Sequence, residues 1–129
     1  MVLLHLRQSD GFFYDNPGIA DRYGLVSFLD RQPIGFVTWY PRNRPEYVEI
    51  GHNRIREHYK GRGYGRLQLE EAIRRIRMYE GLKRIIVCTN CNLIAPKNYE
   101  SAGFVLYHRK PNETGSAFAG DYLYCEMIL

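Results

Sequence analysis

The feature that most constrains this chain is the segment Lys60-Gly61-Arg62-Gly63-Tyr64-Gly65, in which three glycines stand at alternate positions. The run before it, residues 46–55, alternates as a strand does, and residues 65–79 place apolar side chains at helical spacing. Glycines let a backbone turn tightly, and the start of a helix offers unpaired N–H groups and a partial positive charge. The pattern therefore predicts a strand, a turn that suits a pyrophosphate, and a helix.

Two common phosphate motifs do not fit the glycine turn. A Walker loop requires Lys and then Ser or Thr after its last glycine, and neither follows here. The Rossmann pattern needs G-x-G-x-x-G with an acidic residue about twenty positions further on, whereas the spacing here is G-x-G-x-G. Nucleotide hydrolysis and nicotinamide chemistry are therefore disfavoured.

The rest of the chain reads as alternating strands and one more helix. Gln32 and Pro33 are expected to form a hairpin turn, Gly81 to end the long helix, and residues 111–120 to form a polar loop. Glu70 and Glu71 stand four residues before Arg74 and Arg75, a spacing that supports the helix. Strands are predicted at 2–6, 23–30, 34–40, 84–89, 104–109 and 121–129, and a short helix at 94–102.

Length and composition favour one compact domain over residues 1–129. Of these residues, 45% are hydrophobic and 25% charged, as in ordinary globular proteins. No apolar run reaches the roughly 18 residues that span a bilayer, so no membrane contact is expected. The opening apolar stretch is too short for a signal peptide, and the expected compartment is the cytoplasm.

The cationic residues gather around the glycine turn. The net charge is +4, and the local cluster consists of Arg54, Arg56, Lys60, Arg62 and Arg66. Such a cluster favours an anionic partner, which is either a phosphate-bearing ligand or, with Tyr59 and Tyr64 as stacking groups, a nucleic acid. The CTNC spacing of Cys88 and Cys91 has no second ligand pair, so neither a metal nor a disulfide is expected.

Two ordered motifs resemble those of the GCN5-related N-acetyltransferases. Lys60-x-x-Gly63-x-Gly65 is similar to the R/Q-x-x-G-x-G/A segment with which that family binds the pyrophosphate of coenzyme A. Residues 92–104, from Asn92 through Tyr99 to Phe104, resemble the family's N-x-x-A-x-x-x-Y-x-x-x-G-F segment. The resemblance covers roughly residues 23–129. It implies a mixed α+β fold with a splayed, mostly antiparallel central sheet flanked by helices, here with a shortened N-terminal region.

The resemblance also implies where acetyl-CoA would bind as co-substrate. Lys60, in place of the usual Arg or Gln, keeps the charge but gives up the bidentate fork. The family's pantetheine arm pairs with main chain at the positions of Asn53 and Ile55, and its Asn side chain corresponds to Asn92. Arg62 and Arg66 are candidates for contacts with phosphate oxygens. The implied cofactor-binding set is Asn53, Ile55, Lys60, Gly61, Arg62, Gly63, Tyr64, Gly65 and Asn92.

Acyl transfer to an amine requires a base, because deprotonating an amine of pKa about 10.4 near pH 7.4 costs roughly 4 kcal/mol. Glu49-Ile50 followed by Ile55 resembles the family's E-I-x-x-x-x-V pattern, which implies Glu49 as general base. His52 and His58 are rival bases. By simple alternation, His52 is expected on the opposite face of the strand from Glu49.

Tyr99 matches the family tyrosine near the thioester sulfur, and its expected role is to protonate or hydrogen-bond the leaving thiolate. Two readings compete with an acetyltransferase: an acyl-CoA-binding sensor without catalysis, and a basic nucleic-acid-binding domain. The acceptor stays open among aminoglycosides, polyamines, amino acids and protein amines. The loop at 111–120 and the last strand are candidate surfaces for a homodimer.

Overall fold

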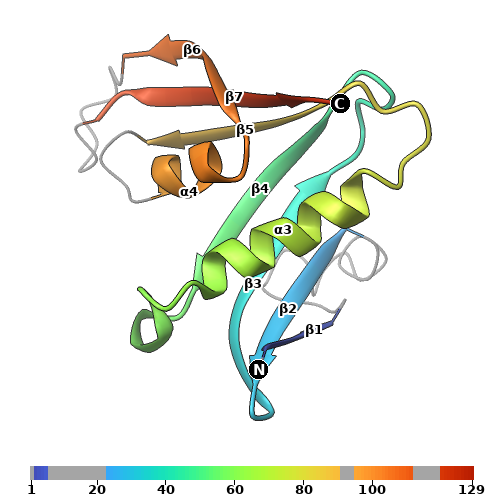
Figure 1. The fold of residues 1–129 in the computed structure, drawn as a ribbon. Coiled ribbons are helices and arrows are strands. Elements are labelled where there is room, and N and C mark those ends of the chain that lie inside the picture. Colours follow the sequence, from blue (N-terminus) through green and yellow to red (C-terminus); the bar gives the residue numbers. More distant parts are fainter. Residues whose placement is uncertain (1, 6–22, 91–94, 112–119) are drawn as a thin grey trace.

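The computed structural model describes residues 2–5, 23–90, 95–111 and 120–129, and the shortening expected near the N-terminus falls within residues 6–22, outside that part. The strands form one sheet in the order β1-β2-β3-β4-β5-β7-β6 (Figure 1). All neighbours are antiparallel except β4 and β5. The strand bounds are Val2–His5 (β1), Gly24–Leu29 (β2), Gln32–Tyr40 (β3), Val48–Ile55 (β4), Arg84–Asn90 (β5), Val105–Lys110 (β6) and Tyr122–Ile128 (β7).

In the part of the chain that the structure describes, two α-helices accompany the sheet. Helix α3 (Tyr64–Ile76) lies along β2, β3 and β4, and the shorter α4 (Ala95–Ser101) lies beside β5 (Figure 1). A 3-10 turn, η1 (Glu57–Tyr59), precedes the glycines. The predicted mixed α+β architecture with a mostly antiparallel sheet is thus confirmed. None of the helices in the described ranges is long and apolar enough to cross a membrane.

Helix α3 ends three residues earlier than the sequence predicts. Beyond Ile76 the main chain tightens, because Met78 N–H donates to Arg75 O and Tyr79 N–H donates to Ile76 O. Gly81, at φ +69°, therefore follows this tightened turn rather than ending the α-helix itself.

The turn between β2 and β3 is also displaced from its predicted place. Asp30 and Arg31 occupy it, at φ 50° and 70°, and Leu29 pairs with Gln32 across the hairpin. A two-residue turn with both residues left-handed matches the twist of the strands it joins. The prediction of Gln32 and Pro33 as the turn was wrong, and both belong to β3.

The core lies between α3 and the sheet. Leu69, Ala72 and Ile76 of the helix are completely buried against apolar side chains of β3, β4 and β5, among them Val48 and Ile85. Trp39 is also buried in this core, and its indole N–H donates to the Tyr79 hydroxyl at 3.2 Å. The apolar stripe that predicted the helix is therefore the surface that attaches it to the sheet.

A β-bulge interrupts β4 close to the glycine turn. Trp39 pairs with Ile50 and Val37 pairs with Asn53, so Gly51 and His52 together face the single residue Thr38. The Thr38 hydroxyl accepts the His52 N–H at 3.1 Å. The extra residue shifts the alternation, and Asn53 therefore lies on the same face as Ile50, toward α3.

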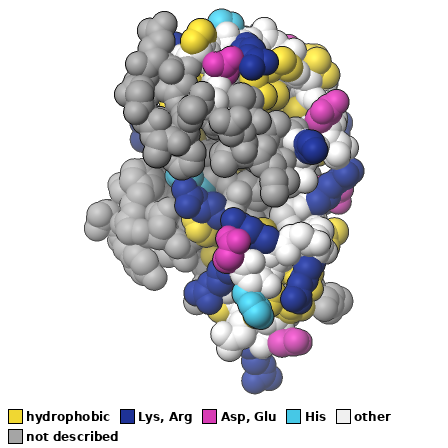
Figure 2. Space-filling model, turned by 90° about the vertical axis from the view of Figure 1, so that its left-hand side faces the viewer, with side chains coloured by type: hydrophobic (Ala, Val, Ile, Leu, Met, Phe, Trp, Pro, Cys, Tyr) yellow, Lys and Arg dark blue, Asp and Glu magenta, His cyan; other side chains and the backbone are white. Residues whose placement is uncertain are grey.

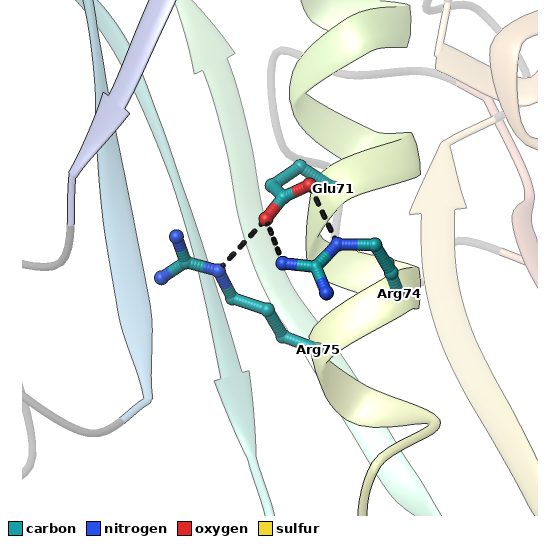
Figure 3. A network of polar contacts seen from close by, with 3 residues as sticks. All are labelled: Glu71, Arg74 and Arg75. Carbon is teal, nitrogen blue, oxygen red and sulfur yellow. Dashed lines mark hydrogen bonds and ion pairs between the residues drawn. The ribbon is translucent and has the colours of Figure 1, made fainter.

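Glu71 of α3 binds two arginine side chains of the same helix, as Figure 3 shows. Its carboxylate accepts hydrogen bonds from Arg74 at 2.6 and 3.0 Å and from Arg75 at 3.1 Å. The hydrogen bonds from Arg74 are the main cause that lowers the pKa of Glu71 to about 2. Glu70 pairs with Arg66 instead of the Arg74 that its spacing suggested.

We expect Glu71→Gln to lower the free energy of unfolding at pH 7 by about 1 kcal/mol, since the arginine partners are partly exposed and screened. Because the folded pKa of Glu71 lies below its ordinary value of 4.5, this difference is present above pH 4.5 and fades as the pH falls toward 2. Urea unfolding followed by Trp39 fluorescence at several pH values measures it, with Glu70→Gln as the control. An equal difference at pH 7 and pH 3 would contradict the expectation.

Candidate active site

The glycine turn presents the start of α3 to solvent without a capping side chain. Gly61 and Gly63 have φ of +77° and +85°, and Gly63 is the residue at the N-cap, with no side-chain cap hydrogen bond. A Cβ at either position would meet no atom within 4 Å, so these glycines are required by backbone conformation rather than by crowding. The first N–H groups of the helix are therefore available to an anion.

Several cationic residues flank this turn in the sequence, and Figure 2, which views the left-hand side of Figure 1, shows Lys and Arg on this face of the molecule, with Asp and Glu between them. Lys60 pairs with Glu57 at 2.9 Å, an exposed ion pair that a stronger anion can displace. The Arg62 guanidinium lies 5.9 Å from the centre of the Tyr59 ring and makes no ion pair with a described carboxylate. Arg66 bonds to Glu70 and to Ser101 O, which ties α3 to the end of α4.

Strands β4 and β5 separate beside the glycine turn. They pair only where Val48, Glu49 and Ile50 meet residues 85–87. Beyond Ile50, β4 continues along β3 as far as Ile55, whereas β5 continues along β7. Among the strands that the structure describes, none pairs with the edge of β4 over residues 51–55 on the β5 side, and an extended ligand can pair with its main chain.

Asn53 and Ile55, predicted to contact the cofactor, lie on this open stretch of β4. The Asn53 side chain turns into the protein, where its Oδ1 accepts a hydrogen bond from Gln68 at 2.8 Å. Ile55 lies close to the first turn of α3, where a Cβ on Gly65 would be 3.5 Å from it. The main chain of both residues lies on the open edge.

Glu49 lies half-buried where β4 and β5 begin to separate, opposite Ile86. Its cross-strand partner Tyr40 follows Trp39, so Glu49 faces away from α3. Burial, and to a smaller extent the charge of Glu49, raise the pKa of the Cys88 thiol. Glu49 forms no ion pair with any cationic side chain in the described ranges, which suits a carboxylate that accepts a proton.

His52 lies on the same face as Glu49, and the prediction from simple alternation was wrong. Its ring is 6.3 Å from that of Phe36, whose partner Arg54 lies on the face away from α3. The bulge at Gly51 is the cause, because it adds one residue between Glu49 and the rest of β4. His58, the other rival base, lies in η1 with its ring against Tyr59 at 5.6 Å.

Tyr99 lies on the other side of the sheet from Glu49. This residue of α4 is buried in the core and only 4% exposed. Its ring is edge-on to that of Phe104, with 5.7 Å between the ring centres. Burial raises the pKa of the Tyr99 phenol to about 12. The two predicted catalytic residues thus come from opposite faces of the sheet. Asn92 lies outside the described residues, and so does Cys91.

Sequence reasoning missed two features of this site. Gln68 is completely buried and bonds to β4, although it is polar. Its position between Gly65 and Leu69, on the helix face that meets the sheet, was the available signal. The second feature is the contact between Cys88 and Tyr124, paired across β5 and β7 on the Glu49 face, which single-sequence patterns do not reveal.

Comparison with known proteins gives a consistent result. Residues 4–104 match the model of the Acetyltransferase (GNAT) family. No curated protein matches the chain. Among solved structures, a GNAT family acetyltransferase from Elizabethkingia anophelis with acetyl-CoA bound has a TM-score of 0.78 at 16% identity, covering 99% of this chain and 98% of that one.

Two further structures share the fold. The ribosomal-protein-S18-alanine N-acetyltransferase of Escherichia coli has a TM-score of 0.80 at 14% identity, over 99% of this chain and 94% of that one. A Bacillus subtilis acetyltransferase in complex with CoA has a TM-score of 0.77 at 17% identity, over 100% and 99%. At these identities the likeness shows the fold, and the site must be argued from this chain's own residues.

Proposed function

The chain belongs to the GNAT acetyltransferase family, and from that premise we propose that it transfers an acetyl group from acetyl-CoA to a primary amine by direct attack. The observation that carries this proposal is the uncapped start of α3 at Gly63, beside the unpaired edge of β4. One accepts a pyrophosphate and the other an extended amide chain, and coenzyme A contains both groups. Structures of an acetyl-CoA complex and a CoA complex on the same fold support it.

The residues present fit this co-substrate. The main-chain N–H groups from Gly61 to Gly65 would hold the pyrophosphate, with the Lys60 and Arg62 side chains beside them. The Lys60 N–H itself donates to Glu57 O. The main chain at Asn53 and Ile55 would pair with the pantetheine amides. Asn92, which lies outside the described residues, keeps its proposed role as a further contact.

Glu49 is the proposed general base. Its carboxylate takes a proton from the acceptor ammonium, directly or through a water, so that the amine attacks with a free electron pair. Bound acetyl-CoA supplies the acyl group and a thiolate leaving group. The pKa of Tyr99, about 12, exceeds that of a thiol near 8.5, so the phenol stabilises the thiolate by donating a hydrogen bond and keeps its proton.

A covalent route through Cys88 is disfavoured. The thiolate is the nucleophilic form of cysteine, and burial raises the pKa of Cys88 above its ordinary value. Its neighbour Tyr124 also has a raised pKa, chiefly because of Cys88. At neutral pH both side chains therefore line the Glu49 face as neutral groups, and they do not carry the acyl group.

The ion pairs of the basic segment weaken the case for a nucleic-acid-binding domain. Lys60, Arg66 and Arg74 of the basic segment each pair with a carboxylate three or four residues away. These carboxylates reduce the net positive charge along η1 and α3, which disfavours a long phosphate backbone relative to a single pyrophosphate at the glycine turn. The proposed setting remains the cytoplasm, where the free Cys88 and Cys125 would stay reduced.

Thiol release tests the function and the acceptor together. Purified protein with acetyl-CoA is assayed with a polyamine, an aminoglycoside, free amino acids, an Ala-initiated peptide and a Lys-containing peptide. We expect free CoA to appear in proportion to one class of acetylated amine. Saturable acetyl-CoA binding without thiol release for any class would support the sensor and contradict an enzyme.

We expect Tyr99→Phe to lower kcat by about ten-fold, since one hydrogen bond to the leaving group is lost. The pH profile of kcat between pH 6 and 9 keeps its shape, because a phenol with a pKa of about 12 does not titrate there. Steady-state rates with the acceptor found above measure both quantities. A loss of the alkaline limb in the variant would contradict a hydrogen-bonding role and indicate a proton-transferring one.

A further inference from the structure

Gln68 is a buried polar side chain that joins three strands to α3. Its Oε1 accepts the Ser27 hydroxyl of β2 at 2.5 Å, and its Nε2 donates to Phe36 O of β3 at 2.7 Å. On β4, the same Nε2 lies 2.8 Å from Asn53 Oδ1 and 3.2 Å from Arg54 O. The surrounding carbonyl oxygens can only accept, so the amide nitrogen must face them.

An apolar side chain would suffice for packing at this position. The neighbouring helix positions Leu69 and Ala72 show this, because they are equally buried and apolar. A buried amide stabilises a fold only when its hydrogen bonds are made, and here two of those bonds go to Asn53 and Arg54, in the part of β4 that has no β5 partner. Gln68 therefore fixes a specific strand segment and does more than fill space.

The link extends to the glycine turn through Asn53. Its Nδ2 lies 3.4 Å from Gly65 O, in the first turn of α3. Asn53 thus contacts both Gln68 and the start of the helix, one turn apart. The open edge of β4 and the N-terminus of α3 are held in one arrangement by two side-chain amides.

We propose that Gln68 is a positioning residue, which holds the open edge of β4 at the distance from the glycine turn that lets one ligand occupy both. This inference rests on the proposed function, since coenzyme A is the ligand with an extended amide arm and a pyrophosphate. Two binding surfaces act together only when their spacing matches the ligand. Without Gln68, the open edge of β4 and the glycine turn both remain, but the distance between them is no longer fixed.

Calorimetric titration of Gln68→Met with two ligands tests the positioning role. Methionine keeps the length of the side chain and removes its hydrogen bonds. We expect the affinity for CoA to fall by about ten-fold, while the affinity for 3′-phospho-ADP, which lacks the pantetheine arm, stays unchanged. Asn53→Ala removes the hydrogen bonds to Gln68 and Gly65 O but leaves the apolar core intact. It should also lower the affinity for CoA and leave the affinity for 3′-phospho-ADP unchanged.

A buried control separates positioning from a general loss of stability. Ile76→Val at the far end of α3 also removes buried contact, and it should change neither affinity. Equal losses for CoA and 3′-phospho-ADP in Gln68→Met, or no loss for either, would overturn the proposal. If the wild-type protein binds CoA no better than 3′-phospho-ADP, the proposed function fails first, and the role of Gln68 fails with it.

Discussion

Replacing Glu49 by Gln is expected to lower kcat by about a hundred-fold or more, which is the usual contribution of a positioned general base. The amide keeps the shape of the side chain at the separation of β4 and β5 but cannot take a proton from the acceptor. Affinity for acetyl-CoA should be unchanged, because the proposed contacts of the co-substrate lie on residues 53–55 and the glycine turn. Stopped-time thiol release and calorimetry on the same preparation measure both.

Two controls accompany the Glu49 variant. Glu46→Gln removes a carboxylate just before β4 that pairs with Lys83 at 2.8 Å, and it should leave kcat unchanged. His52→Asn tests the rival base, which the bulge places on the same face. A large loss in His52→Asn with full activity in Glu49→Gln would transfer the role of base to His52.

Gly63→Asp is expected to weaken acetyl-CoA binding by about a hundred-fold, because it combines a strained left-handed backbone with a negative charge at the anion site. The φ of +85° favours glycine, and the space around the missing Cβ is open, so no steric clash complicates the result. The variant should still fold, since the cost of one such residue is about 1–2 kcal/mol. Calorimetry with acetyl-CoA measures the loss.

Gly81→Asp is the matched control for Gly63→Asp. Gly81 also has a positive φ, +69°, and its Cβ would also meet nothing within 4 Å, but it follows the opposite end of α3. The two variants share the backbone strain and the added charge, and they differ in distance from the proposed pyrophosphate. Equal affinity losses in both would place the effect in stability and contradict an anion site at Gly63.

The sequence was sufficient for the strands, for α3 and for the turn between them, because these depend on local periodicity and on glycine. It was less reliable where packing between strands decides the outcome. A Cβ at Gly51 would lie 2.5 Å from the Tyr40 ring and 2.8 Å from Thr38 Oγ1. This crowding occurs at the β-bulge that places His52 on the same face as Glu49. A lone glycine inside a strand pattern often marks a bulge, so this feature left a readable signal.

The role of Gln68 could not have been predicted from the sequence. Its partners Ser27, Phe36 and Asn53 are 15 to 41 positions away, and only the folded sheet brings them together. The position of Tyr99 relative to Glu49 depends in the same way on which face α4 covers. The motifs selected the residues of the candidate site. The sheet face on which each side chain lies, and the hydrogen bonds between distant residues, depend on the tertiary structure.

The most direct test of the central claim is a calorimetric titration of the purified protein with acetyl-CoA, with ATP and a short RNA as controls at the same salt concentration. The account predicts saturable binding of acetyl-CoA at one site per chain, weak or no binding of the controls, and a clear loss of affinity in Gly63→Asp. No binding of acetyl-CoA together with salt-sensitive binding of the RNA would contradict it and indicate that the basic segment serves a nucleic acid.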